Sequence, residues 1–189
     1  MIQPPFRRAT PEDAGTLAEL VEFASEGLAL HLWTEIAGAG HDPRERVRSE
    51  SYGVSYKNAV IAQLAGQPMS GLISYPLRDW PEPISDKLPA VLVPLHELMN
   101  LAPDTWYVHA LAAYPKYRGR GQGSALLALA DNLAAAGGTA GLSLIVSDTN
   151  ASARKLYERC GYREAAHCAM VKEGWPHPGT NWVLMRKRF

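Results

Sequence analysis

The sequence is poor in cysteine and in long apolar segments. Only Cys160 and Cys168 occur among its 189 residues; this excludes a disulfide framework, and their spacing is not that of zinc ligands. We therefore expect two reduced thiols and no metal site. No stretch approaches the roughly 20 apolar residues that cross a bilayer, and the first residues lack the apolar core of a secretory signal. We expect a cytoplasmic protein with no membrane partner.

The formal net charge at pH 7 is zero. Lysine and arginine number 19, and aspartate and glutamate also number 19. The molecule as a whole therefore does not attract nucleic acid, and we expect no nucleic-acid partner. With 47% hydrophobic and 20% charged residues, the composition is typical of a globular protein, and the length fits a single domain over residues 1–189. Any anion site must come from a local cluster of charge.

Hydrophobic patterning predicts strands that alternate with helices. The predicted strands are residues 3–8, 58–65, 70–75, 106–113, 141–146, 162–171 and 181–188. The predicted helices are an amphipathic one from Thr10 to Ala24, then 26–36, an exposed one at 42–50, 121–136 and 150–160. The alternation of strand and helix in the middle of the chain implies an α/β protein with a mixed sheet.

Residues 76–104 are rich in proline. Six of the 14 prolines lie in this segment, which excludes a long strand or helix apart from a short one around Leu92 to Leu101. Long irregular insertions are often lids or loops over a functional site. We interpret this segment as a candidate loop of that kind.

The strongest local signal is the stretch Arg118-Gly119-Arg120-Gly121-Gln122-Gly123-Ser124, between a predicted strand and a predicted helix. Glycines let the backbone approach an anion closely, and the free N–H groups at a helix start point toward it. The basic residues Lys116, Arg118 and Arg120 add local positive charge. We interpret the stretch as an anion site, with a diphosphate as its natural ligand.

Two other phosphate-binding loops differ from this stretch. The nucleoside-triphosphate loop needs a lysine followed by serine or threonine after its glycines, and neither pair is present. The dinucleotide fingerprint G-x-G-x-x-G fails at Ser124, where the third glycine belongs. Asp148 follows the next strand and is a candidate for the ribose-binding acid of that fingerprint. An NAD(P)-binding Rossmann-type oxidoreductase therefore stays open as an alternative.

Two linked blocks resemble the GNAT superfamily of acyl-CoA-dependent N-acetyltransferases. Residues 118–123 match the family signature of Arg or Gln, two residues, Gly, one residue, then Gly or Ala. The block from Asn150 to Tyr162 resembles the family's Asn…Tyr-Glu…Gly-Phe/Tyr helix and the strand after it. The resemblance covers residues 106–164. It implies a GNAT-like α/β (α+β) fold with a mixed, mostly antiparallel twisted sheet of about six to seven strands flanked by helices. It also implies transfer of an acetyl group from acetyl-CoA to a primary amine.

The resemblance assigns roles to particular residues. The backbone of residues 111–113 would bond the pantetheine arm, the N–H groups of residues 119–124 would hold the pyrophosphate, and Asn150 would contact the co-substrate. Tyr157 matches the family's general acid, whose phenol protonates the departing sulfur. The candidate cofactor-binding residues are Leu111, Ala112, Ala113, Arg118, Gly119, Arg120, Gly121, Gln122, Gly123, Ser124 and Asn150.

The base that accepts the amine's proton is less well marked. A glutamate that part of the family carries five residues before the asparagine is replaced here by Ile145. His109 resembles a histidine that arylalkylamine-type acetyltransferases use on the same strand. The strand's alternation places it on one face with Tyr107, Leu111 and Ala113. His109 is the candidate base, acting directly or through water, and ordered water alone is the alternative.

The acceptor is expected to be an amine of a small molecule or of a protein. Candidate lining residues on the first two helices are Glu22, Glu26, His31, Trp33 and Glu35. Trp80 and His96 in the proline-rich segment, with the 175–182 loop, are candidate walls of the same acceptor groove. Family members often pair, so a homodimer is compatible with the resemblance. A non-catalytic CoA-binding module is the third functional class, and the presence of Tyr157 argues against it.

Overall fold

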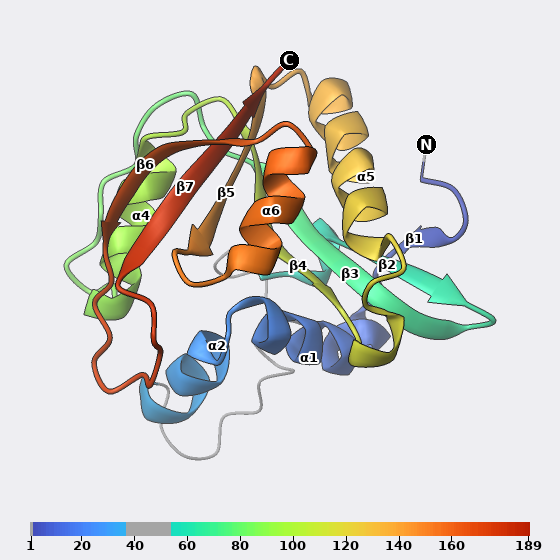
Figure 1. The fold of residues 1–189 in the computed structure, drawn as a ribbon, viewed down its shortest axis with the longest axis horizontal. Coiled ribbons are helices and arrows are strands. Elements are labelled where there is room, and N and C mark those ends of the chain that lie inside the picture. Colours follow the sequence, from blue (N-terminus) through green and yellow to red (C-terminus); the bar gives the residue numbers. More distant parts are fainter. Residues whose placement is uncertain (1, 37–53) are drawn as a thin grey trace. The chain divides into compact units, whose positions relative to one another are not determined.

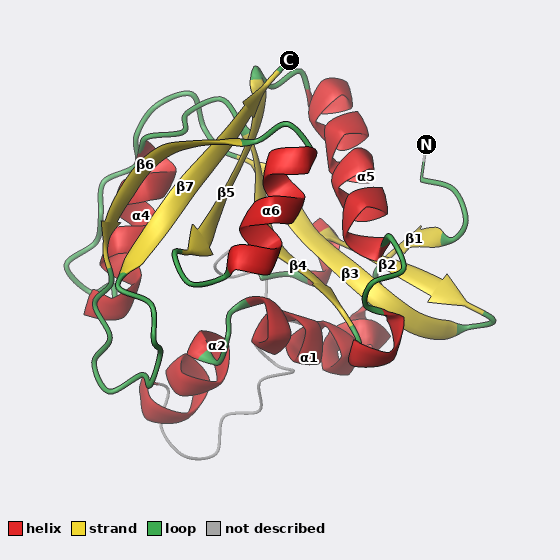
Figure 2. Cartoon of the chain, viewed as in Figure 1, coloured by secondary structure: helices red, strands yellow, loops and turns green. Residues whose placement is uncertain are grey.

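The computed structural model describes residues 2–36 and 54–189. They include a seven-stranded sheet in the order β1-β2-β3-β4-β5-β7-β6, accompanied by helices (Figures 1 and 2). The strands are β1 (Phe6–Arg8), β2 (Ala59–Leu64), β3 (Gln67–Pro76), β4 (Trp106–Ala113), β5 (Gly141–Ser147), β6 (Arg163–Ala169) and β7 (Asn181–Arg188). The helices are α1 (Ala14–Ala24), α2 (Leu28–His31), α4 (Val93–Asn100), α5 (Gln122–Gly137) and α6 (Ala151–Arg159). The helix predicted at 42–50 lies outside the described residues.

The sheet is mixed and mostly antiparallel, as predicted. Strands β1 and β2, β2 and β3, β5 and β7, and β6 and β7 pair antiparallel, while β4 and β5 pair parallel. A Rossmann domain needs a sheet that is parallel throughout its nucleotide-binding half. The Rossmann alternative is therefore wrong at the level of the fold.

The chain divides into two compact units, and each is described here by itself. The first unit comprises Met1–Tyr75 and His109–Leu129, and the second comprises Pro76–Val108 and Ala130–Phe189. Strand β4 and helix α5 each contribute residues to both units. A single domain over residues 1–189 stays a prediction.

In the first unit, helix α1 packs on strands β2 and β3. Its apolar residues recur at helical spacing and share one buried cluster with Ile61 of β2 and Ile73 of β3. Gly71 of β3 permits a close approach, because a Cβ there would lie 2.7 Å from Leu20 Cδ1. Before α1, the Arg7 guanidinium donates to both carboxylate oxygens of Asp13. These contacts fix α1 against β2 and β3.

The helix predicted over residues 26–36 is wrong in its first turn. Glu26 and Gly27 have φ angles of 53° and 93°, in the left-handed region, so the helix cannot run through them. Helix α2 starts only at Leu28, and a π-helical turn over Leu32–Ile36 follows it.

In the second unit, β5 is buried along almost its whole length, as expected for a continuous apolar run. Strand β7 lies beside it at close range, since a Cβ at Gly141 would overlap the carbonyl oxygen of Lys187. Lys187 also forms an ion pair of 2.7 Å with Asp131 of α5. Helix α4 packs against β6 and β7. Arg154 of α6 forms an ion pair of 2.8 Å with Glu164 of β6, which ties α6 to these strands.

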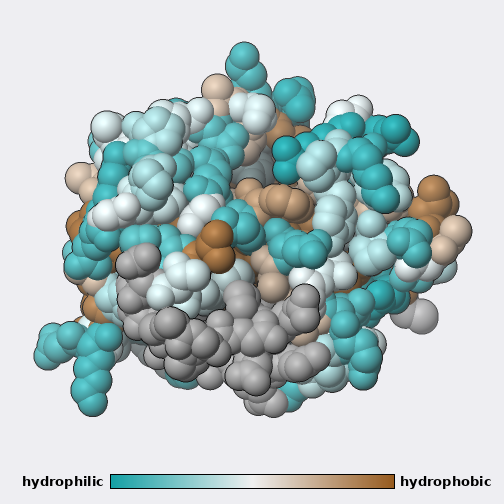
Figure 3. Space-filling view, turned by 90° about the horizontal axis from the view of Figure 1, so that it is seen from below, coloured by the Kyte–Doolittle hydropathy of each residue, from teal (hydrophilic) through white to brown (hydrophobic). Residues whose placement is uncertain are grey.

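On the face seen in Figure 3, hydrophobic residues lie singly or in small groups between polar ones. The large exposed hydrophobic residues include Phe23, Leu30, Leu64 and Trp80. Among the described residues, none of the helices combines the length and apolar character that a membrane span requires.

Candidate functional site

The glycine turn, residues 118–124, connects β4 to α5 in the first unit. Gly119 and Gly121 have φ angles of 71° and 79°, which L side chains rarely adopt. Both are exposed, and no heavy atom lies within 4 Å of where their Cβ atoms would be. The glycines are therefore required by backbone conformation, and the turn presents an open main chain to solvent.

The start of α5 follows directly from this turn. The first N–H groups of an α-helix have no partner within the helix, and the first helical hydrogen bond beyond the turn runs from Ala125 N to Gly121 O. Ser70 of β3 holds the Gln122 side chain, because its buried hydroxyl donates to Gln122 Oε1 at 2.9 Å. Arg118 is exposed, and its Nε donates to the carbonyl of Ala113 at 3.0 Å. This open, positively charged helix start has the features of an anion site.

Strand β4 leads into the glycine turn. His109, Leu111 and Ala113 are half-buried while Ala110 and Ala112 are buried, so the predicted alternation holds from His109 onward. It does not extend to Tyr107, which was placed on the His109 face but is buried. Strand β4 therefore gives residues 109–113 a more open face that Tyr107 does not share.

His109 has an aromatic neighbour that the sequence did not indicate. Tyr75 at the end of β3 places its hydroxyl 3.4 Å from His109 Nδ1, with the two ring centres 5.9 Å apart. This contact bears on the tautomer: if Nδ1 carries the proton and donates to Tyr75, the Nε2 lone pair is the basic one. Tyr75 and Ser70 were both missed, because contacts between β3 and residues about 35 to 50 positions later leave no local pattern.

Asn150 and Tyr157 lie on the second unit. The Asn150 side chain caps α6, since its Oδ1 accepts from Ala153 N at 3.1 Å. Tyr157 follows seven residues later on the same face of the helix and is 9% exposed. Its ring lies 6.0 Å from that of Tyr162 at an angle of 57°. Helix α6 and the neighbouring Tyr162 ring thus hold Tyr157 in a buried position.

Asp148 has a structural role instead of the ribose-binding role considered for it. Its carboxylate accepts hydrogen bonds from the backbone N–H and the hydroxyl of Thr180, and from the backbone N–H and the side-chain amide of Asn181. Burial raises the pKa of Asp148, but these hydrogen bonds together lower it more, so the pKa lies below its ordinary value. Asp148 therefore joins the end of β5 to the start of β7.

Two of the candidates for the acceptor groove make contacts within the fold itself. Glu22 accepts a hydrogen bond from Leu30 N at 2.8 Å, so this carboxylate caps α2. In the 175–182 loop, Trp175 and Trp182 are buried and stack with ring centres 5.7 Å apart. Their faces pack against each other rather than forming a wall, which corrects the expectation for this loop. The side chain of Glu35 lies outside the described part of the structure.

The proline-rich segment is ordered around α4. Trp80 is 56% exposed, with the Arg78 guanidinium 5.5 Å from its ring centre. Asn100 holds the backbone of Glu82 through two hydrogen bonds. Burial lowers the pKa of His96, against the opposing charge of Glu82. Trp80 is thus an exposed aromatic on an anchored loop, as a recognition residue would require.

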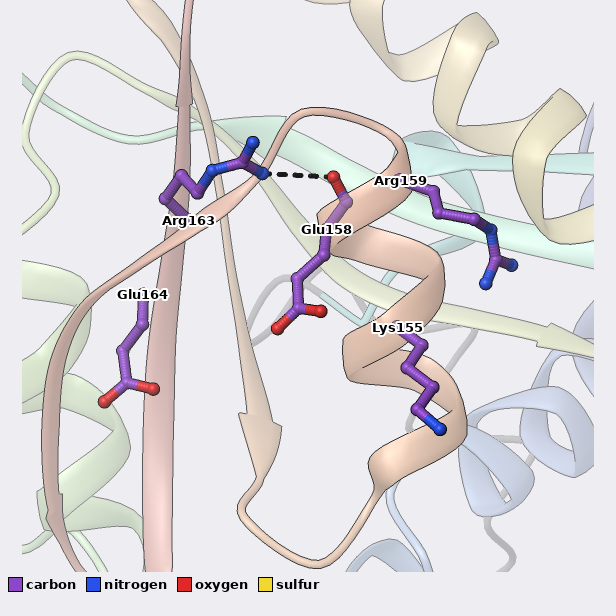
Figure 4. A pocket seen from close by; sticks show the side chains of 5 residues that line it. All are labelled: Lys155, Glu158, Arg159, Arg163 and Glu164. Carbon is purple, nitrogen blue, oxygen red and sulfur yellow. Dashed lines mark hydrogen bonds between the residues drawn. The ribbon is translucent and has the colours of Figure 1, made fainter.

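An open pocket on the second unit lies outside the predicted site residues. It is lined by Lys155, Glu158, Arg159, Arg163 and Glu164 (Figure 4). Arg163 donates to the backbone carbonyl of Glu158, while Lys155 and Arg159 extend from the opposite side of α6. The lining is fully charged and of mixed sign. Within residues 2–36 and 54–189, no cluster of side chains has the makeup of a metal site, and both cysteines are free.

Solved structures resemble this chain in fold. A structure described as an acetyltransferase matches with a TM-score of 0.64 and 22% identity, covering 97% of this chain and 98% of that one. The ribosomal-protein-S18-alanine N-acetyltransferase from Escherichia coli matches with a TM-score of 0.60 and 18% identity, over 97% and 92% of the two chains. A putative streptothricin acetyltransferase from Bacillus anthracis, in complex with acetyl coenzyme A, matches with a TM-score of 0.51 and 21% identity, over 69% and 61%.

Sequence comparison gives the family. The search of curated proteins found no match. The family model described as the acetyltransferase (GNAT) family matches residues 30–162, which include β4, the glycine turn and all of α6. The predicted resemblance is thereby confirmed, and the chain belongs to the GNAT acetyltransferase family, whose members are acyl-CoA-dependent N-acetyltransferases.

Proposed function

We propose that this protein transfers the acetyl group of acetyl-CoA to a primary amine of a small molecule or a protein, by direct attack within a ternary complex. The observation that carries the proposal is the glycine turn, an exposed run of main-chain donors at the start of α5. A diphosphate fits such donors and the positive end of a helix dipole. The structural neighbour from Bacillus anthracis, in complex with acetyl coenzyme A, supports the choice of donor.

The proposed binding uses main chain more than side chain. The N–H groups of residues 119–124 would hold the diphosphate, and the backbone of residues 111–113 would bond the pantetheine arm as an added strand would. Ser70 supports this arrangement from β3 by fixing the Gln122 side chain. Binding of both reactants in one complex replaces a bimolecular encounter with a positioned one.

The proposed reaction replaces a C–S bond of the thioester with a C–N bond. The lone pair of a neutral amine attacks the thioester carbonyl carbon, the C–N bond forms, and the C–S bond breaks as the electrons return to sulfur. Tyr157 would donate its phenolic proton to that sulfur, and His109 would accept a proton from the amine directly or through water. The largely buried phenol of Tyr157 and the half-buried imidazole of His109 suit donor and acceptor roles.

The acceptor is proposed only by chemical class. The structural neighbours include enzymes described by a small-molecule acceptor and by a ribosomal-protein acceptor, so an amine panel must contain both kinds.

Calorimetric titration with acetyl-CoA, and with NADPH in parallel, tests the donor. Gly121→Trp should abolish acetyl-CoA binding, because a bulky side chain fills the open turn and the backbone at a φ of 79° is strained. Gly66→Trp is the matched control: its φ is 77°, it is equally open, and it lies in the turn between β2 and β3. Loss of binding in the first variant alone supports the proposal, and NADPH binding in place of acetyl-CoA would overturn it.

A further inference from the structure

Helix α1 reaches the segment that carries the glycine turn through Tyr114. The Tyr114 hydroxyl donates to Glu19 Oε2 at 2.6 Å, and the Tyr114 ring meets the Phe23 ring edge to face, at 5.9 Å and 82°. The backbone N–H of Tyr114 also bonds to Met69 O of β3 at 3.0 Å. Tyr114 is thus fixed from two directions, by a helix and by a strand.

Phe23 in turn lies under Arg118, the first residue of the glycine turn. The guanidinium carbon of Arg118 lies 5.6 Å from the centre of the Phe23 ring, within the range of a cation–π contact. Arg118 Nε donates to Ala113 O, so two contacts set the direction of this side chain. The ion pairs among the described residues do not include Arg118, and the residue is exposed to solvent.

We propose that Phe23, held by the Glu19–Tyr114 bond, is a positioning residue that orients the Arg118 guanidinium toward a phosphate of acetyl-CoA. This inference rests on the proposed function and adds a side-chain contact to a site otherwise made of main chain. An arginine side chain loses rotamer freedom when it is ordered. A side chain that is already directed loses less of it on binding, and its fork of N–H groups matches phosphate oxygens.

The arrangement holds at neutral pH. Burial, followed by the hydrogen bond and charge of Glu19, raises the pKa of Tyr114 to about 12. The phenol therefore stays protonated and keeps donating to Glu19. Phe23 itself is 40% exposed, more than a core residue would be. Its ring face serves Arg118, so replacing it should change binding more than folding.

The test is a double-mutant cycle on acetyl-CoA affinity, measured by calorimetry on the full chain. Phe23→Leu keeps apolar bulk but removes the ring, and we expect about a 3- to 10-fold weaker affinity. Arg118→Ala should weaken binding at least as much, and adding Phe23→Leu to it should cause no further loss. Phe23→Tyr keeps a ring face and should bind as the wild type does. Leu30→Ala, an exposed apolar residue on α2 (48% exposed), is the matched control and should change nothing.

Three results would overturn the inference: Phe23→Leu binds as the wild type does, its loss persists in the Arg118→Ala background, or Phe23→Tyr fails to restore affinity. A purely structural role for Phe23 would show itself as a lower unfolding temperature and a loss independent of Arg118. If the wild type does not bind acetyl-CoA at all, the proposed function fails first and this inference fails with it. Wild-type binding with an unchanged Phe23→Leu affinity refutes the inference alone.

Discussion

Two strand-to-helix connections in this molecule differ in exposure and in hydrogen bonding. Each joins the end of a strand to the start of a helix: the glycine turn joins β4 to α5, and residues 148–150 join β5 to α6. The first is exposed and has left-handed glycines. In the second, which we call the closed connection, the polar groups are already hydrogen-bonded. Asp148 accepts from Thr180 and Asn181, and Asn150 caps the helix.

The difference indicates that the two connections have different roles. A connection with open backbone donors can accept an anion, whereas one whose donors are already bonded has fewer of them left for a ligand. The helix held in this way, α6, carries Tyr157. Substitutions in the glycine turn should therefore change acetyl-CoA affinity, and substitutions along the second connection and α6 should change stability or the rate of transfer.

The largest effect is expected at Tyr157. Tyr157→Phe removes the proposed proton donor, so we expect kcat to fall about 100-fold or more while acetyl-CoA affinity stays within about twofold. A thiol-release assay with an amine panel measures the first, and calorimetry the second. The control is Tyr162→Phe: this hydroxyl is buried without a hydrogen-bond partner among the described residues, so its removal should be neutral or slightly stabilising. Equal losses in the two variants would remove the acid role from Tyr157.

The next effect concerns the closed connection at Asp148. Asp148→Ala leaves donors of Thr180 and Asn181 without their acceptor, and we expect a loss of about 1–2 kcal/mol in the free energy of unfolding, since water reaches this half-buried site. Denaturant unfolding at pH 7 measures it. Asp86→Asn, at an exposed acid on the same unit, is the control and should be neutral.

The same residue predicts a pH dependence. The pKa of Asp148 is lower in the fold than its ordinary value, so its carboxylate stabilises the protein above the unfolded pKa of about 3.9. That contribution is lost as the pH falls through the lower, folded pKa. The difference between wild type and Asp148→Asn should therefore be full at pH 7 and shrink below about pH 4. A difference that stays constant down to pH 2.5 would contradict the hydrogen-bonded carboxylate.

Much of the fold could be predicted from local patterns. Strands 106–113 and 181–188 were predicted with the bounds that the structure gives. The first strand was predicted from Gln3 but starts at Phe6, because Pro4 and Pro5 before it have no N–H group to donate. The insertion of β7 between β5 and β6 depends on pairings between distant residues, such as Ser147 with Trp182, which leave no local periodicity.

The main-chain features of the candidate site could be predicted from the sequence. The glycine turn and the cap at α6 appear in the sequence as glycines and an asparagine before a helix. The supporting contacts do not: Ser70 with Gln122 and Phe23 with Arg118 join residues 52 and 95 positions apart. Asp148 and Glu22 were assigned to ligands because an acid's hydrogen-bond partners cannot be seen in the sequence alone.

The smallest effect is expected at Asn150, and it tests whether this residue contacts acetyl-CoA in addition to capping α6. Asn150→Ala removes the cap on Ala153 N, and we expect a loss of about 1 kcal/mol in stability. Asn150→Asp keeps an accepting oxygen at the helix start and should restore that stability. A carboxylate cannot donate as the amide does, so if Asn150 also contacts acetyl-CoA, Asn150→Asp will bind it more weakly while folding as well as the wild type. Unchanged affinity in Asn150→Asp would instead restrict Asn150 to its role as the cap of α6.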